Sequence, residues 1–515
     1  MKENRISMGR RIGTYTVKWL FLLCIAFVAF EAYINGADNQ ANKLWLLVLL
    51  AAGLTCLMVT RQIARKYRET IEKHCWKMTV GYLFILFVLQ IMIGNVLRYT
   101  PTFDLDAVYG GAVSWVENGN IAAYQDYFYY FPNNLGLLTF FRILFGIAKT
   151  LSGSSVDYFF VGVIAGSVSL TVMRFSVIWI CKKLLGSEYA VVSMVLMLFC
   201  LPLYFAAATF YTDVISMAAP ALFYLFYLYS REASSWKKRI GWYLAMSLVA
   251  AVGMEIKFTV LIIVIAVTIE MLLKDSWKNC LLMIGIHILV IAGIFALVNR
   301  MVYPSLLDRT QAEKQNTPYL HWVMMGAKGD GYYNPEDYEF SRSFDDPEER
   351  DHAIKEEVIR RYREMGVQGV MNLWKAKTIR DFGDGTYALS DFLDDGPVNE
   401  TGLHDWILYA GKNYKQYRTV CLGFFVMIMV LMLAGVLESM CRRGVAAGKE
   451  TAIWLAFFGI WLFLMLWETS GRYFSNYLSV MLIAAVLGIS YLEEKMFSFW
   501  TWLRASWKNE NEIAR

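Results

Sequence analysis

The chain has 515 residues, of which 57% are hydrophobic and 18% are charged, and its mean hydropathy is +0.40. Soluble domains average about 45–50% apolar and about 25% charged residues, so this composition excludes a soluble protein. The net charge of +5 comes from segments expected to face the cytoplasm. It therefore indicates orientation in a membrane and gives no support for binding to nucleic acid.

The apolar residues fall in blocks of about 17–23 residues, the length that lets an α-helix cross about 30 Å of hydrocarbon. The first block follows a basic stretch but lacks a small-residue cleavage site, which predicts a retained helix and not a signal peptide. Thirteen candidate blocks lie at about 17–34, 44–59, 78–96, 135–150, 156–181, 189–208, 213–230, 241–254, 258–273, 280–298, 415–437, 451–467 and 474–492. The sequence thus predicts an all-α polytopic membrane protein.

Basic connections between the blocks identify the cytoplasmic side of the membrane. They lie at 61–77, 182–183, 231–239, 274–278 and 442–449. All five reach the same side only if one block does not cross, and 135–150 is the best candidate because it is short and carries Arg142 in its middle. We expect this block to lie in the membrane interface as a juxtamembrane helix, with its Leu and Phe residues inward. About twelve transmembrane helices remain, and both termini are then cytoplasmic.

This topology divides the chain into membrane segments and one large polar region. The predicted parts are an N-terminal transmembrane hairpin with a basic cytoplasmic segment (1–77), a membrane core that includes a first outer loop at 97–155 (78–298), an extracytoplasmic domain (299–414), C-terminal transmembrane helices (415–492) and a cytoplasmic tail (493–515).

The region 299–414 is too long to be a plain connector, and it has 21 acidic and 14 basic residues, a net charge of −7. We expect a folded domain there, either α/β or mainly helical. Asp346 and Pro347 predict a helix start, because they supply an N-cap and the preferred first residue, and Gly366 predicts its end. A second helix is predicted at about 367–380.

Ionisable residues in the short outer connections are costly unless they have a partner or a function. The candidates are Asp104 and Asp106 after the third block, Asp213 in the next outer turn, Glu255 with Lys257, and Glu468 with Arg472. The topology brings all of them to the non-cytoplasmic face. Each also has a purely structural interpretation: the aspartates could cap helices, Glu255 and Lys257 could pair with each other, and Glu468 and Arg472 have the spacing of a helical ion pair.

Carboxylates and cations at one membrane face suit the transfer of a sugar from a lipid phosphate. A carboxylate takes the proton of the acceptor hydroxyl, while Lys and Arg bind the phosphate that leaves. The outer histidines 321, 352 and 404 are isolated, and the eight cysteines show no CxxC spacing, so neither a metal site nor another cofactor is indicated. The need for a divalent metal is left open.

The combination of these outer segments resembles the GT-C fold of lipid-linked glycosyltransferases, in particular the protein O-mannosyltransferases (bacterial family 39-like) and aminoarabinose transferases. Phe103 to Tyr109 resembles their first acidic loop, Tyr129 to Gly136 their Tyr-Pro-Asn-Asn stretch, and Thr209 to Asp213 their second acidic loop. Trp467 to Tyr473 resembles the last outer loop, and the resemblance covers roughly residues 78–492.

The resemblance implies an inverting glycosyltransferase of the cytoplasmic membrane, active on its outer face. Its donor would be a polyprenyl-phosphate sugar, and its acceptor a cell-wall polymer, a lipid or a protein. Asp106 or Asp104 would be the general base, and we prefer Asp106 because Tyr109 then falls where the mannosyltransferases place a ring. The remaining implied roles are orientation of a substrate by Asp213, phosphate binding by Lys257 and Arg472, and substrate contacts by Glu255, Glu468, Asn133 and Asn134.

Two other functions compete with this interpretation. A lipid-linked oligosaccharide ligase or polymerase would be expected to have an outer loop rich in arginine and histidine, whereas 299–414 is acidic. A transporter or flippase would favour inverted repeats and polar residues near the middle of the membrane. The charged residues here gather at one face, and no repeat is visible.

Overall fold

The computed structural model describes residues 8–36, 43–394, 396–441, 450–493 and 495. Within this part of the chain every regular element is a helix, and the one extended pairing is an isolated bridge between Tyr99 and Pro397. The α/β alternative for 299–414 is therefore wrong, and that region is helical. The basic connection 442–449 and most of the predicted tail at 493–515 lie outside the described residues.

By length and composition, ten helical segments in the described residues could cross a membrane. They are Met8–Asn35 (α1), Lys43–Lys66 (α2), Arg68–Val96 (α3), Pro132–Ser155 (with α6, Leu135–Ser152), Tyr158–Leu185 (α7), Thr212–Glu232 (with α10, Thr212–Ile215, and α11, Ala218–Glu232), Trp236–Ile256 (α12), Trp277–Ser305 (with α14, Trp277–Leu297), Tyr414–Cys441 (α21) and Ser475–Glu493. A bent pair, Ser187–Leu198 with Pro202–Ala208, makes an eleventh.

The number of segments that could cross a membrane differs from the predicted twelve for two reasons. Two predicted spans are shorter helices in the structure, α13 (Leu261–Lys274) and α22 (Thr451–Leu466), with 14 and 16 residues. In the other direction, α6 is long and apolar enough to be counted, although the charge pattern predicts that it does not cross.

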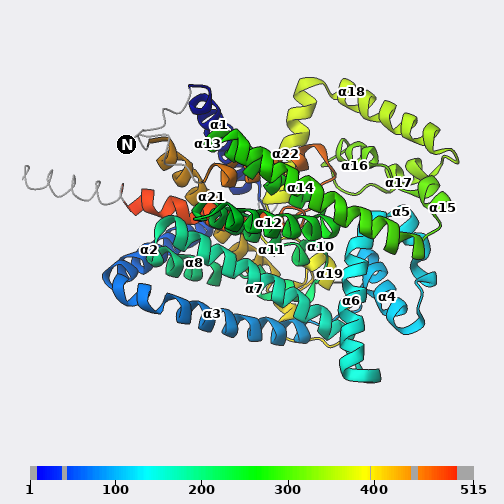
Figure 1. Cartoon of the computed structure of the whole chain (residues 1–515), viewed down its shortest axis with the longest axis horizontal. Helices are drawn as coiled ribbons and strands as arrows, with labels where there is room; N and C mark the ends of the chain where they lie inside the picture. The colour runs from blue at the N-terminus through cyan, green and yellow to red at the C-terminus, as the bar shows by residue number, and fades with distance from the viewer. Residues whose placement is uncertain (1–7, 37–42, 395, 442–449, 494, 496–515) are drawn as a thin grey trace, which may run out of the picture.

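The orientation of α6 bears on this difference. Figure 1 shows α6 running across the direction of α3 and α7. One side of α6 buries Leu138, Phe141 and Phe145 against the bundle, while Ile143 and Ile147 are exposed. The orientation across α3 and α7 fits the predicted position along the membrane interface, which stays a prediction.

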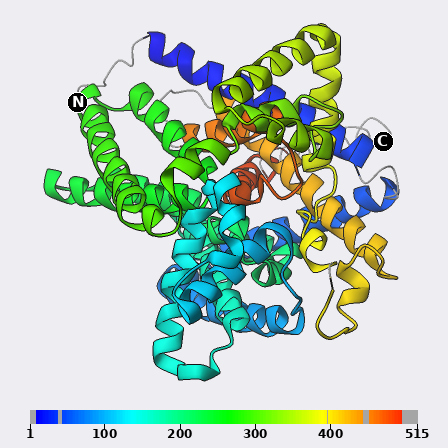
Figure 2. The same cartoon turned by 90° about the vertical axis from the view of Figure 1, so that its right-hand side faces the viewer.

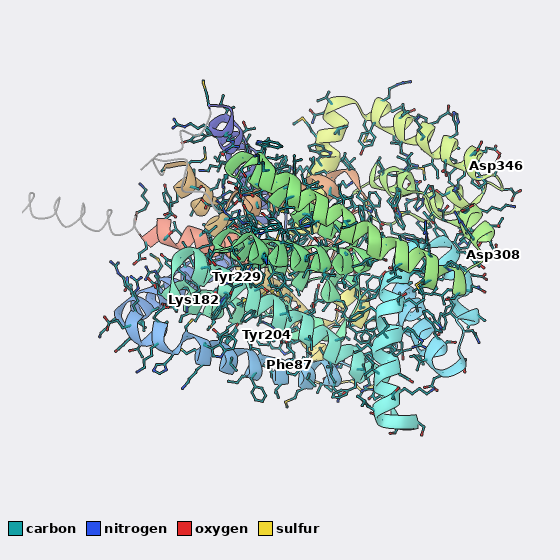
Figure 3. The ribbon with its side chains drawn as sticks, viewed as in Figure 1. Phe87, Lys182, Tyr204, Tyr229, Asp308 and Asp346 are labelled. Carbon is teal, nitrogen blue, oxygen red and sulfur yellow. The ribbon has the colours of Figure 1, made fainter. Side chains whose placement is uncertain are left out.

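The segments outside the long helices gather at one end of the bundle, which we call the domain end (Figures 1 and 2). Figure 3 shows Asp308 and Asp346 at this end and Lys182, from a predicted cytoplasmic connection, near the other. The domain end comprises α4 (Phe103–Asn118), α5 (Gln125–Tyr130), α15 (Arg309–Gln315), α16 (Tyr319–Gly326), α17 (Pro335–Arg342), α18 (Pro347–Phe382), α19 (Ser390–Leu393) and α20 (His404–Ile407).

The predicted helix pair in the domain is confirmed as two halves of α18. The Asp346 carboxylate accepts a hydrogen bond from the backbone N–H of Glu348, and Pro347 is the first helical residue. Gly366 has φ 57° and interrupts the helical backbone, a conformation that a residue with a side chain rarely adopts. The second half of α18 thereby turns back toward α22 (Figure 1).

The bent span positions one wall of the candidate site. Its two parts, α8 (Ser187–Leu198) and α9 (Pro202–Phe205), meet at an angle of 77°. The carbonyl group of Leu203 accepts hydrogen bonds from two buried side chains, Gln90 at 2.7 Å and Arg174 at 3.2 Å. A break in a helix leaves backbone groups without their helical partners, and in an apolar surrounding these two hydrogen bonds supply partners for the Leu203 carbonyl group. They also stabilise the segment that leads to α10.

Candidate functional site

Three charged side chains from distant parts of the chain form one buried cluster at the domain end. Asp213, in the first turn of α10, pairs with Lys257, which lies between α12 and the next helix. The other Asp213 oxygen accepts a hydrogen bond from Nη1 of Arg472 at 3.0 Å. The side chains are only 5%, 13% and 18% exposed for Asp213, Lys257 and Arg472. Two cations thus share one carboxylate away from bulk water.

Aromatic rings complete the surroundings of these cations. The Arg472 guanidinium lies 5.0–5.3 Å from the ring centres of Tyr211, Phe392 and Tyr473, and the Lys257 ammonium lies 5.3 Å from that of Tyr473. A ring face attracts a cation through its negative quadrupole. The rings therefore help to hold two like charges near each other.

The predicted local pairs do not form. Lys257 and Arg472 bind Asp213, so the structural interpretations that pair Lys257 with Glu255, or Arg472 with Glu468, are wrong. Glu255 instead accepts a hydrogen bond from the Tyr303 hydroxyl at 3.0 Å and stands apart from the cluster.

A second carboxylate, Asp104, lies in a hydrogen-bond network beside this cluster. It accepts a hydrogen bond from the Tyr127 hydroxyl at 2.8 Å, and the Tyr211 hydroxyl lies 3.3 Å from its other oxygen. Asn134 joins both rings, donating to the Tyr127 oxygen at 2.6 Å and lying 3.1 Å from the Tyr211 hydroxyl. The N-cap of α4 is Thr102, so Asp104 is free of a capping role.

Asp104 and Asp106 lie in different surroundings. Two residues along an α-helix correspond to about 200° of rotation, so Asp104 and Asp106 face different directions. Asp106 has Tyr124 as its ionisable neighbour. The Tyr109 ring packs against Phe145 and Phe210, and Asn133 is exposed. Of the residues predicted in this loop region, the structure brings only Asp104 and Asn134 into the cluster.

Glu468 is the third carboxylate of the site. It is 4% exposed, and it accepts a hydrogen bond from the Tyr473 side chain. Burial raises the pKa of Glu468 to about 7, and the nearby charge of Asp104 acts in the same direction. A carboxyl group with a pKa near neutrality can give or take a proton under physiological conditions.

A small cavity lies beside Asp213 and Arg472. Its other lining residues are mostly apolar: Pro202, Leu203, Ala206, Thr209, Val214, Met217, Tyr387, Leu389, Phe392 and Ser475. A space with apolar walls and two ionic groups suits a molecule that is part hydrocarbon and part charged.

The comparisons with known proteins address the family. A family model described as "conserved hypothetical integral membrane protein" matches residues 14–492. The chain belongs to that family. None of the curated proteins matches the chain significantly.

One solved structure with a loose likeness to this integral membrane protein is the crystal structure of ArnT from Cupriavidus metallidurans bound to undecaprenyl phosphate. The sequences are 12% identical, the match covers 82% of this chain and 78% of the other, and the TM-score is 0.34. A likeness of this degree does not permit residues to be compared or a shared reaction to be argued.

In this membrane protein, Glu468 should make stability depend on pH. Its pKa rises from an ordinary 4.5 to about 7 on folding, so the unfolded chain loses this proton first as the pH increases. The contribution of Glu468 to stability, about 3 kcal/mol, is therefore fully present below pH 4.5 and is lost as the pH rises toward 7. We expect Glu468→Gln to flatten this part of the curve of melting temperature against pH, measured between pH 4 and 8 in detergent micelles. Parallel curves for the two proteins would contradict the assignment.

Lys377, in the second half of α18, connects the domain to the site and was not singled out from the sequence. Its buried ammonium donates three hydrogen bonds, to the carbonyl oxygens of Gly326 at 3.0 Å, Met465 at 3.1 Å and Trp467 at 2.6 Å. Burial lowers the pKa of Lys377 to about 8. The signal in the sequence is its spacing from Leu373, which places a lysine on the buried face of the helix.

Replacing Lys377 by methionine should loosen the segment that carries Glu468. The change leaves three carbonyl groups without this donor, and an unsatisfied buried group costs about 1–3 kcal/mol, so we expect a loss of about 3 kcal/mol in the free energy of unfolding. Hydrogen exchange at residues 465–470 should become faster. Lys355→Met, at an exposed position of α18, is the matched control and should change neither quantity. Equal exchange in both variants would contradict a role of Lys377 in holding the segment 465–470.

Among the described residues, no group of three or more His, Cys, Asp or Glu side chains is arranged to hold a metal ion. The acidic residues of the site instead face cations and hydroxyl groups.

Proposed function

We propose that the protein is an inverting glycosyltransferase that moves a sugar from a polyprenyl-phosphate donor to an acceptor at the outer face of the cytoplasmic membrane. The observation that carries the proposal is the convergence of Asp104, Asp213, Lys257, Glu468 and Arg472, from separate segments, beside a largely apolar cavity. The sequence resemblance to GT-C glycosyltransferases supports the same reaction.

In the proposed reaction, Asp104 is the general base. It takes the proton of an acceptor hydroxyl, whose oxygen attacks the anomeric carbon as the bond to the phosphate oxygen breaks. The leaving phosphate keeps the bonding electron pair. A single displacement of this kind inverts the anomeric configuration. The hydroxyls of Tyr127 and Tyr211 fix the orientation of the Asp104 carboxylate before the acceptor arrives.

Lys257 and Arg472 stabilise the charge that develops on the leaving phosphate. Their site has little water, which strengthens the electrostatic interaction. Asp213 holds both cations in position in the resting state, and the apolar cavity accepts the part of the lipid next to the phosphate. The proposed reaction uses no organic cofactor.

The basic connections support an orientation in which the domain end is outside the cell and both termini are in the cytoplasm. In this orientation the acceptor is a cell-wall polymer, a lipid or a protein.

The proposal is tested with purified protein in proteoliposomes that contain a radiolabelled polyprenyl-phosphate hexose and an envelope fraction as acceptor. We expect label to move to the acceptor fraction with release of polyprenyl phosphate. If the labelled lipid crosses the bilayer unchanged, the protein is a flippase. If a panel of lipid-linked hexoses and aminosugars gives neither result, the proposal fails.

A further inference from the structure

Five aromatic side chains from separate segments form a patch at the domain end, which we call the ring patch: Phe131, Trp322, Tyr333, Tyr338 and Trp467. Phe131 stacks on Tyr338 with ring centres 6.3 Å apart and planes at 16°. Trp322 lies 6.0 Å from Phe131 and stacks on Trp467 at 6.5 Å and 25°. Tyr333 extends the patch from Tyr338 at 6.3 Å.

The ring patch stays partly open to solvent. Tyr333 is 48% exposed, and the other four side chains are partly buried. Rings that served only as a core would be covered on both faces, because buried aromatic area is a main source of packing energy. The rings pack on one another and on Phe463, and what the ring patch leaves open to a ligand is the Tyr333 ring and the partly exposed parts of the other four side chains.

The patch is continuous with the proposed active site. The Tyr127 ring lies 5.1 Å from Phe131, and its hydroxyl donates to Asp104. At the other side, Trp467 directly precedes Glu468, whose pKa burial raises to about 7. A molecule lying on the rings would have polar groups on the side of Tyr127, whose hydroxyl binds Asp104.

This position limits the chemistry of the occupant. A sugar ring has faces of C–H groups, which carry partial positive charge and pack on the negative face of an aromatic ring, and an edge of hydroxyl groups, which donate to carboxylates. An acyl chain has no hydroxyl to offer Asp104. Membrane-interface rings would be expected on the sides of the spans, whereas three of these rings lie on or beside α16 and α17 of the domain.

We infer that the ring patch binds a sugar unit of the acceptor, so that the acceptor is a carbohydrate. The inference rests on the proposed function and narrows its acceptor class. In this arrangement the sugar packs against the open parts of Trp322 and Phe131, and its free hydroxyl points to Asp104.

The test measures binding, so that it does not depend on the transfer reaction. Purified protein in nanodiscs is titrated with a hexose tetramer and with an N-acetylhexosamine tetramer, and binding is followed by calorimetry and saturation-transfer NMR. We expect at least one tetramer to bind, Trp322→Leu to weaken its binding about tenfold, and Trp322→Phe to retain most of it. The matched control is Trp406→Leu, an exposed tryptophan of the same domain outside the patch, which should bind as the wild type does.

The outcomes separate the inference from the proposed function. Binding of neither tetramer, or equal binding by the Trp322→Leu and Trp406→Leu proteins, overturns the inference. A wild-type protein that binds a tetramer through Trp322 but transfers no sugar keeps carbohydrate binding at the ring patch and removes the proposed function, and with it the role of that carbohydrate as acceptor. Asp104→Asn should bind the tetramer normally and fail only in transfer.

Discussion

Asp104→Asn is expected to reduce the rate of sugar transfer by at least about 100-fold, because loss of a positioned general base typically costs about 10²–10⁴ in rate. The amide oxygen can still accept from Tyr127, and the amide NH2 can donate to the Tyr211 oxygen while the Tyr211 hydroxyl donates to Asn134, so the surrounding network and the fold should be kept. The measurement is initial transfer rate in proteoliposomes, with the melting temperature recorded on the same preparation.

Asp106→Asn is the matched control for this experiment. It changes the same residue type on the same helix but outside the network, and we expect less than about threefold loss of rate, as for a group that takes no part in proton transfer. If Asp106→Asn removes activity and Asp104→Asn does not, the assignment of the base from the structure is wrong and the preference from sequence resemblance is right.

Asp213→Leu should be the most destabilising single change in the site. Removing the carboxylate leaves Lys257 and Arg472 buried, unpaired with Asp213 and repelling each other, and breaking a buried ion pair typically costs about 3–5 kcal/mol. We expect a loss of that size in the free energy of unfolding, measured by denaturant titration in detergent. The double variant Asp213→Leu with Lys257→Met should recover part of it.

Asp405→Leu provides the comparison at an exposed pair. Asp405 lies 2.8 Å from Lys412, with side chains 38% and 73% exposed, and such surface pairs contribute about 0–1 kcal/mol. Equal losses for Asp213→Leu and Asp405→Leu would contradict a buried, interdependent cluster.

Local signals in the sequence predicted several elements correctly. Asp346, Pro347 and Gly366 identified both halves of α18, because capping and positive φ depend on a few neighbouring residues. Hydropathy located the long helices for the same reason, whereas the position of α6 along the interface stays a prediction from the charge pattern. The helices α13 and α22 begin within three residues of the predicted blocks 258–273 and 451–467, but with 14 and 16 residues they are shorter than the ten segments that could cross a membrane.

The partners within the site could not be predicted in this way. Asp213 binds residues 44 and 259 positions away, whereas the sequence offered nearer partners for both cations. The choice between Asp104 and Asp106 depended on where α4 begins, because a helix start fixes the direction of every side chain that follows. Lys377 is hydrogen-bonded to backbone carbonyl groups. Every residue type has such a group, so the sequence does not indicate which residues are the partners.

The contacts of Lys377 should respond to ionic strength differently from the surface ion pairs. Surface pairs of the same domain, such as Arg309 with Glu313 and Arg360 with Glu364, weaken as salt screens their charges. The Lys377 ammonium donates to three carbonyl groups and is 0% exposed, so dissolved ions cannot reach it or compete with these partners. The domain surface should thus respond to the salt content of its surroundings, while the joint between α18 and the segment that carries Glu468 and Arg472 stays the same.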